Sequence, residues 1–143
     1  MKRTLLFLII GLLVMSYINC QSSDKKTVDS NKKEITSTVR GYYFHGTRRC
    51  TTCKAVEEVT KEILNDYYET ELAEKRISFE SINLDEEDSK VLASTLNVSG
   101  QTLLFVSDTD TVNLTNQAFM NAVSNPSKLS VLITDEIEKM LNR

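Results

Sequence analysis

The segment that most constrains this chain is residues 39–53, VRGYYFHGTRRCTTC. Its first half is rich in β-branched and aromatic residues, which is typical of a strand, and it leads into a short polar loop. The loop ends in Cys50 and Cys53, and apolar residues at helical spacing follow at once. A helix N-terminus offers unsatisfied N–H groups and positive potential, both of which stabilise a thiolate. The segment therefore predicts a redox-active dithiol at a strand-to-helix junction.

The N-terminal residues 1–19 have the pattern of a signal peptide. Lys2 and Arg3 are followed by an apolar run over residues 5–15 that only Gly11 interrupts. The run is short for a membrane-spanning helix, which needs about 20 residues. We therefore expect export from the cytoplasm, into a compartment where a cysteine pair can cycle with exported proteins.

A third cysteine, Cys20, follows the apolar run, and the chain then turns polar at once. This arrangement resembles a bacterial lipoprotein signal, which implies that Cys20 becomes the lipidated first residue of the mature chain. Tyr17 and Asn19 stand where such signals prefer leucine and a small residue. Lipidation of Cys20 would leave Cys50 and Cys53 as a pair and so account for the odd cysteine count. The alternative is an ordinary signal peptide or an uncleaved anchor, with Cys20 as a spare thiol.

Residues 20–36 contain almost nothing apolar and are expected to form a flexible tether, so that residues 37–143 make up one domain. The chain has 17 Lys and Arg against 20 Asp and Glu, a formal net charge of −3. Loss of Lys2 and Arg3 would leave 15 against 20, or −5. This acidity argues against a nucleic-acid partner, which needs clustered cations. We expect a lipid-anchored domain in the bacterial cell envelope, facing the periplasm.

Periodicity in the domain predicts seven elements in the order β-α-β-α-β-β-α. The strands are expected at residues 39–44, 77–84, 102–106 and 112–114. The first helix follows the cysteines, the second spans residues 89–96, and Asn125-Pro126 starts the last. The expected inward residues of the first two helices are Val56, Val59, Ile63, Tyr67, Val91, Leu92 and Leu96. The order predicts a mixed sheet of about four strands with helices on both faces.

This order, with CxxC at the start of the first helix, resembles the thioredoxin fold. The closer resemblance is to a small group of bacterial thioredoxin-like proteins catalogued as nitroreductase-subunit relatives of the ArsF type. The matching residues are Tyr42, Tyr43, Phe44, His45, Gly46, Arg49, Cys50 and Cys53. No phosphate-binding loop for a flavin or nicotinamide is visible, and the chain has only four glycines, so we expect no cofactor.

The thioredoxin resemblance implies that Cys50 is the nucleophile and Cys53 the more buried, resolving thiol. Arg48 and Arg49 are expected to lower the pKa of Cys50, and His45 is a second candidate for tuning the pair. Three other readings remain open. Cys50, Cys53 and His45 could instead bind copper or zinc. The two cysteines could form a static disulfide, or the domain could be a non-catalytic docking module.

One departure from thioredoxins concerns the turn at residues 99–102, SGQT, where they carry a cis-proline facing the disulfide. The only proline of this chain is Pro126, and we expect a trans peptide at the turn because a non-proline cis bond costs about 2.5–4 kcal/mol. The missing proline argues against a broad substrate range. It favours a dedicated partner, an exported protein or a membrane redox partner that carries a dithiol or disulfide.

Overall fold

The computed structural model describes residues 38–142. The predictions for the signal peptide, for Cys20 and for the tether lie outside the described residues. The elements are β1 (Val39–His45), α2 (Thr51–Ala73), β2 (Ile77–Asn83), α3 (Ser89–Thr95), β3 (Thr102–Val106), β4 (Thr111–Asn113), α4 (Thr115–Asn121) and α5 (Pro126–Leu141).

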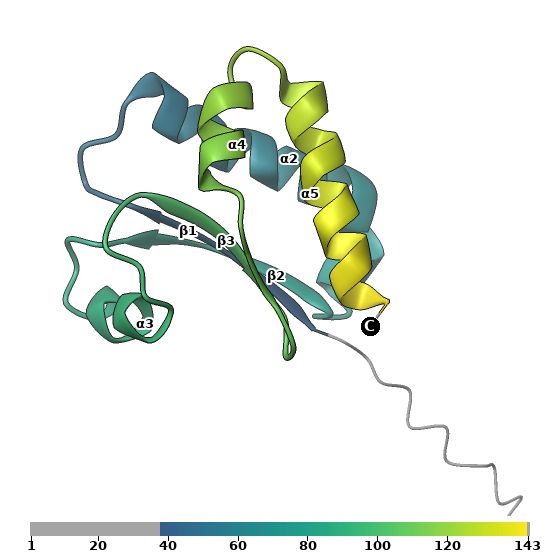
Figure 1. Ribbon diagram of the computed structural model, residues 1–143, viewed down its shortest axis with the longest axis horizontal. Coiled ribbons are helices and arrows are strands. Elements are labelled where there is room, and N and C mark those ends of the chain that lie inside the picture. The colour runs from purple at the N-terminus through teal and green to yellow at the C-terminus, as the bar shows by residue number, and fades with distance from the viewer. Residues whose placement is uncertain (1–37, 143) are drawn as a thin grey trace, which may run out of the picture. The chain divides into compact units, whose positions relative to one another are not determined.

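The four strands form one mixed sheet in the order β2-β1-β3-β4. β1 runs parallel to β2 and antiparallel to β3, and β3 pairs with β4 as an antiparallel hairpin. Parallel neighbours need a crossover, which α2 supplies between β1 and β2. The arrangement is a thioredoxin-like α/β fold, so the predicted fold class is confirmed (Figure 1).

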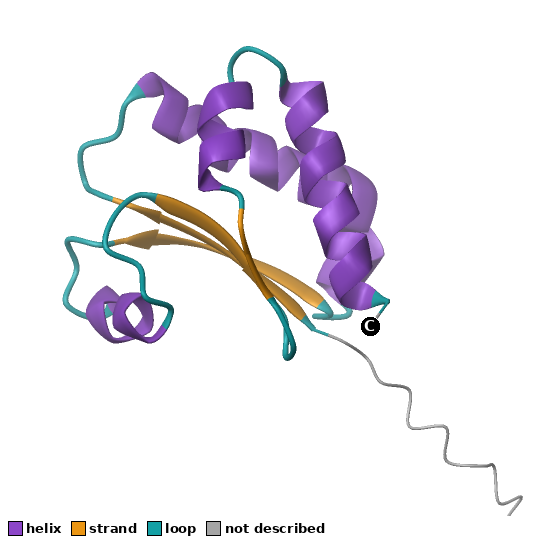
Figure 2. Cartoon of the chain, viewed as in Figure 1, coloured by secondary structure: helices purple, strands orange, loops and turns teal. Residues whose placement is uncertain are grey.

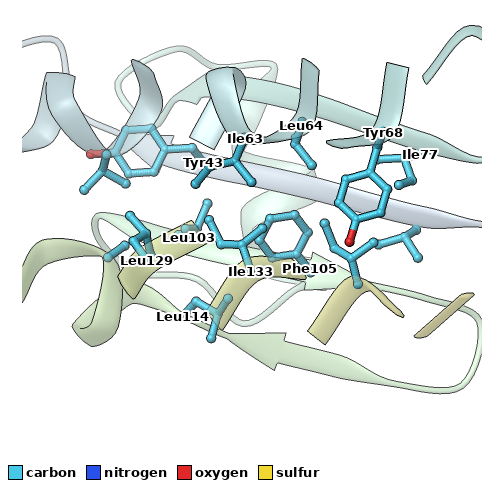
Figure 3. Close-up of a cluster of buried hydrophobic side chains, with 14 of the residues drawn as sticks. Tyr43, Ile63, Leu64, Tyr68, Ile77, Leu103, Phe105, Leu114, Leu129 and Ile133 are labelled. Atoms are coloured by element: carbon cyan, nitrogen blue, oxygen red, sulfur yellow. The ribbon is translucent and has the colours of Figure 1, made fainter. Parts of the chain in front are cut away.

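Helices cover both faces of the sheet, as predicted (Figure 2). Because side chains alternate along a strand, Tyr43 of β1 joins the large core beneath α2, α4 and α5, whereas Tyr42 and Phe44 join a smaller cluster beneath α3. The large core contains several fully buried side chains, among them Phe105 and Ile133 (Figure 3). β1 pairs with strands on both sides and carries buried residues on both faces, and the loop that leads to the dithiol leaves from its end.

A glycine in the middle of β1 allows two aromatic rings to approach the strand. A Cβ built at Gly41 would lie 2.9 Å from ring atoms of both Phe79 and Phe105, the neighbours of Gly41 on β2 and β3. Any other residue would force these packed rings to move, so the sheet packing favours glycine here.

The helix α4 was not predicted. The buried Leu114, Ala118 and Ala122 recur every four positions across and beside this helix, but the segment is short and the apolar Phe119 and Met120 between them obscure the helical period. The helix is held at its start by Asn113, whose side-chain oxygen accepts a hydrogen bond of 3.0 Å from the backbone N–H of Thr115. The helix α4 therefore lies between β4 and α5, which the sequence predicted to follow one another directly.

Two residues expected to face the core are exposed instead. Tyr67 is 64% exposed and Val91 is 76% exposed, so both predictions were wrong. In α2 the buried positions shift to Leu64 and Tyr68, and the backbone leaves helical geometry at Tyr68, with φ −134° and ψ 30°. This kink turns the end of the helix, which a regular helical period does not anticipate. In α3, Ala93 is buried in place of Val91.

Candidate functional site

The two cysteines span the first turn of α2. Cys50 is the N-cap residue, with an extended backbone (φ −76°, ψ 168°), and its Sγ accepts a hydrogen bond of 3.2 Å from the backbone N–H of Cys53. The two sulfurs are at disulfide distance, and the Cα atoms are 5.1 Å apart, within the range for a disulfide. The CxxC pair therefore sits at the N-terminus of a helix, as the sequence predicted.

The two cysteines differ in their exposure to solvent. Cys50 is exposed at the end of the loop that follows β1, whereas Cys53 is only 2% exposed. This confirms the expected burial of Cys53. Cys50 is thus accessible to a partner, whereas Cys53 is held inside the protein.

Arg49 points inward, toward the first turns of α2. Its guanidinium forms an ion pair with Glu57, and its Nη2 donates a hydrogen bond of 3.3 Å to the carbonyl oxygen of Cys53. Its Cζ lies 5.6 Å from the centre of the Tyr43 ring, within the range of a cation–π interaction. The side chains of Arg49 and Glu57 are 20% and 12% exposed. Arg49 therefore joins the dithiol loop, the helix and the central strand.

Glu57 carries the negative charge that offsets Arg49. Burial raises the pKa of Glu57, but hydrogen bonds with Lys61, Arg49 and Ser81 together outweigh it, so the pKa lies below its usual value. A charged Glu57 offsets much of the positive potential that Arg49 was expected to lend to Cys50. The role of Arg49 in tuning the thiolate stays a prediction. Arg48 is exposed.

Two buried polar atoms beside this ion pair lack hydrogen-bond partners within residues 38–142. They are the hydroxyl oxygen of Tyr43 and Nε of Arg49. Burial raises the pKa of Tyr43, and the neighbouring guanidinium of Arg49 acts in the opposite direction. An unsatisfied buried polar group costs about 1–3 kcal/mol. The junction of β1 and α2 therefore retains costly polar groups directly next to the dithiol loop.

His45 is the last residue of β1. Its Nδ1 lies 3.0 Å from the carbonyl oxygen of Gly46, and its own carbonyl accepts a hydrogen bond of 2.7 Å from the backbone N–H of Leu84. In the described part of the chain no group of three or more His, Cys, Asp and Glu side chains is placed to hold a metal ion. The structure therefore does not bring His45 together with Cys50 and Cys53 as a metal centre.

The loop between β1 and Cys50 is anchored to the loop after β2. The backbone N–H of Thr47 donates a hydrogen bond of 2.7 Å to Asp85, and Asn83 donates one of 3.1 Å to the hydroxyl of Thr47. The hydrogen bonds from the backbone and side chain of Thr47 lower the pKa of Asp85, with a smaller contribution from His45. This contact holds the chain that leads to Cys50.

Gln101 belongs to the site and was missed by reasoning from the sequence. Its Oε1 lies 3.4 Å from Sγ of Cys53. Gln101 is in the turn before β3, where thioredoxins carry the cis-proline, and the peptide bonds of residues 38–142 are all trans. The absent proline marked this turn as relevant to the dithiol, but nothing in the sequence showed that the glutamine side chain reaches Cys53.

The fold and the site define a thioredoxin-like α/β domain with a CxxC pair at the start of its first helix. No family model matches the chain. No curated protein matches it either. A solved structure described as that of a malarial protein is similar at 22% identity with a TM-score of 0.46, and the match covers 68% of this chain and 96% of that one. Within residues 38–142, no helix combines the length and apolar character needed to cross a membrane.

Proposed function

We propose that this protein is a thiol–disulfide oxidoreductase in which Cys50 is the nucleophile and Cys53 the resolving thiol. The observation that carries the proposal is the unequal exposure of two cysteines, at disulfide distance, on the first turn of a helix. Exchange needs one sulfur that a partner can reach and a second that closes the ring after the partner has reacted.

The reaction follows from this geometry. The Cys50 thiolate attacks one sulfur of a partner disulfide, so that a Cys50–partner bond forms and the other partner sulfur leaves as a thiolate, which takes up a proton. Cys53 then loses its proton and attacks Sγ of Cys50. The Cys50–Cys53 disulfide closes and the second partner sulfur leaves. Two electrons pass from the dithiol to the partner, and the same steps in reverse oxidise a partner dithiol.

The start of α2 supports the role of Cys50. The first backbone N–H groups of a helix have no partner within it, and here the N–H of Cys53 donates to Sγ of Cys50. Such donors favour the thiolate over the thiol and lower the pKa of the cysteine. Arg49 holds the same turn through the carbonyl oxygen of Cys53.

For the cellular setting we propose a domain anchored through lipid on Cys20 after removal of residues 1–19, facing the periplasm on a tether of residues 20–36. The partner proposed is an exported protein or a membrane redox protein with a dithiol or disulfide. The sequence pattern of the N-terminus supports the anchor. The presence of Gln101 where thioredoxins carry a proline supports a dedicated partner. The relation to the ArsF-type group remains part of this proposal.

The test is the reduction potential of the pair in the full-length protein. The protein is equilibrated with mixtures of reduced and oxidised glutathione, quenched with an alkylating agent and analysed by mass spectrometry at Cys50 and Cys53. We expect a single two-electron transition, and its midpoint sets the direction of electron flow. In Cys53→Ser, Cys50 should accumulate as a mixed disulfide with glutathione. A pair that stays oxidised under strong reductant, or that forms no mixed disulfide, would refute the proposal.

A further inference from the structure

We propose that Gln101 is a catalytic residue of this exchange reaction, and that its side-chain amide binds the sulfur of Cys53 and stabilises the thiolate that closes the ring. The inference rests on the proposed function, because it concerns the second step of the same reaction. It starts from the contact of 3.4 Å between Oε1 of Gln101 and Sγ of Cys53.

The sheet brings Gln101 to the dithiol. β3 runs antiparallel to β1, so that Thr102 at the start of β3 pairs with Phe44 near the end of β1. The hydroxyl of Thr102 donates a hydrogen bond of 2.9 Å to the carbonyl oxygen of Gly100, which shapes the turn on either side of Gln101. The residue before β3 therefore lies beside the strand end from which the dithiol loop departs.

Packing does not force the glutamine onto the sulfur. Gln101 is an exposed residue, and a Cβ built on the preceding Gly100 would have no atom within 4 Å. A long polar side chain in such an open turn has many conformations in water. Its amide oxygen nevertheless lies against the nearly buried Sγ of Cys53, which in this structure is bonded to Cys50 and carries no proton, so the contact seen is an approach of oxygen to sulfur that becomes available for hydrogen bonding once the pair is reduced.

The amide suits both protonation states of Cys53. The thiol can donate its proton to the Oε1 atom of Gln101, and after deprotonation the amide can rotate to donate an N–H to the thiolate. A nearly buried thiolate needs such a donor, because burial disfavours the charged form. The resolving cysteine can then become a nucleophile without a permanent charge beside it.

The charged groups around Cys53 are already engaged with other atoms. From the loop, Arg49 reaches the carbonyl oxygen of Cys53 and not its sulfur. From α2, Glu57 is bound by Arg49 and Lys61. These contacts direct both charged side chains away from the sulfur, and Gln101 is the polar side chain that the structure places against it.

The test measures how readily Cys53 forms its thiolate. The full-length protein carrying Cys50→Ser is alkylated with iodoacetamide from pH 6 to pH 10, and modification of Cys53 is followed by peptide mass spectrometry. Adding Gln101→Leu should lower the rate at pH 8 by about tenfold, as expected for loss of a hydrogen bond to a charged group, and move the rate profile to higher pH. Gln101→Glu, which places a negative charge beside the sulfur, should move it further. Ser99→Ala, in the same exposed turn, should leave it unchanged.

A profile that is the same with Gln101, with leucine and with glutamate at this position would overturn the inference. Far-UV circular dichroism and thermal unfolding of each variant establish that the fold is retained. The inference and the proposed function fail differently. If the wild-type pair cycles with glutathione while the three profiles coincide, only the role of Gln101 is refuted. If the wild-type pair does not cycle, the proposed function is refuted and this inference with it.

Discussion

Nη2 of Arg49 donates a hydrogen bond to the carbonyl oxygen of Cys53 at 3.3 Å, so a cation from the loop before the helix is fixed to the helix's first turn. The same guanidinium pairs with Glu57, one turn beyond Cys53, and lies over the ring of Tyr43 in the central strand. The sequence suggested that Arg49 would act on Cys50 through its charge. That role stays a prediction, and the contacts add another: Arg49 supports the first turn of α2 at Cys53, while Cys50 remains exposed.

We expect Glu57→Gln to reveal how much this support contributes to stability. Removing the carboxylate leaves the partly buried charge of Arg49 without its partner, and we expect a loss of about 2 kcal/mol at pH 7, less than the cost of breaking a fully buried pair. Urea unfolding measures the loss. Glu58→Gln, at the adjacent and exposed position, is the matched control and should change stability by less than about 0.5 kcal/mol.

The same variant should change the acid limb of the stability curve. The pKa of Glu57 is lowered in the folded protein, so its contribution is complete above the unfolded pKa, about 4.3, and is lost as the pH falls through the folded value. The stabilities of wild type and Glu57→Gln should therefore converge toward pH 3. A constant difference from pH 7 to pH 3 would contradict the role given to this carboxylate.

Tyr68 should make stability fall at high pH. Burial, followed by the charges of Glu138, Glu71 and Asp135, raises the pKa of Tyr68 to about 12. A raised pKa stabilises the fold fully below the unfolded value of about 10, and this contribution is lost as the pH rises toward 12. Tyr68→Phe should flatten that decline, and it should cost about 1 kcal/mol at pH 7 through loss of the hydrogen bond to the carbonyl oxygen of Thr134.

The neighbouring tyrosine supplies the control for this measurement. Tyr67 is exposed and differs from Tyr68 by one position in the same helix. Tyr67→Phe should leave both the stability at pH 7 and its decline between pH 10 and pH 12 as in wild type, measured by urea unfolding at each pH. Equal effects of the two substitutions would show that burial of Tyr68 at the kink does not cause the loss of stability between pH 10 and pH 12.

Gly41→Ala should destabilise the sheet by about 1–3 kcal/mol, the usual cost of overpacking a filled core. The added Cβ would meet Phe79 and Phe105 at 2.9 Å, and both rings are packed against the large core. Gly100→Ala is the control, since its Cβ meets nothing within 4 Å, and it should be neutral or stabilising by up to about 1 kcal/mol. Thermal and urea unfolding decide between them, and a Gly41→Ala protein as stable as Gly100→Ala would refute the packing described for β1.

Much of the fold could be predicted because its signals are local. The β-branched and aromatic run before the cysteines, the apolar run at residues 102–106 and the Asn125-Pro126 helix start each act within a few residues, and each corresponds to an observed element. The helix α4 escaped because its 7 residues are too few for a clear helical period, and the apolar Phe119 and Met120 obscure the spacing of the buried Leu114, Ala118 and Ala122. The exposure of Tyr67 escaped because it depends on a kink in α2.

The position of the dithiol could be predicted, but its surroundings could not. Cys50 and Cys53 lie within one turn of helix, so their spacing alone brings them together. Gln101 meets Cys53 across 48 residues, through the pairing of β1 with β3. Glu57 is one of several charged residues in the sequence of its helix, and only the ion pair with Arg49 makes it part of the site. Contacts of this kind depend on tertiary packing, which periodicity does not encode.

Arg49→Lys tests directly whether the guanidinium positions Cys53. A lysine ammonium is a compact charge that cannot make planar contacts with Glu57, the Cys53 carbonyl oxygen and the Tyr43 ring at once. In the reduced wild-type protein, Cys50 should be alkylated much faster than Cys53, because only Cys50 is exposed. Arg49→Lys should loosen the first turn of α2 and reduce the ratio of the two rates.

The adjacent arginine separates this structural effect from a general effect of charge. Arg48 is exposed and precedes Arg49 directly, so Arg48→Lys keeps the charge and should leave the ratio of the Cys50 and Cys53 alkylation rates unchanged. Mass spectrometry of the alkylated peptides gives both rates in one sample. If the two lysine variants behave alike, then the contacts of Arg49 do not hold the resolving cysteine in place. If only Arg49→Lys speeds the alkylation of Cys53, then the guanidinium of Arg49 keeps Cys53 buried.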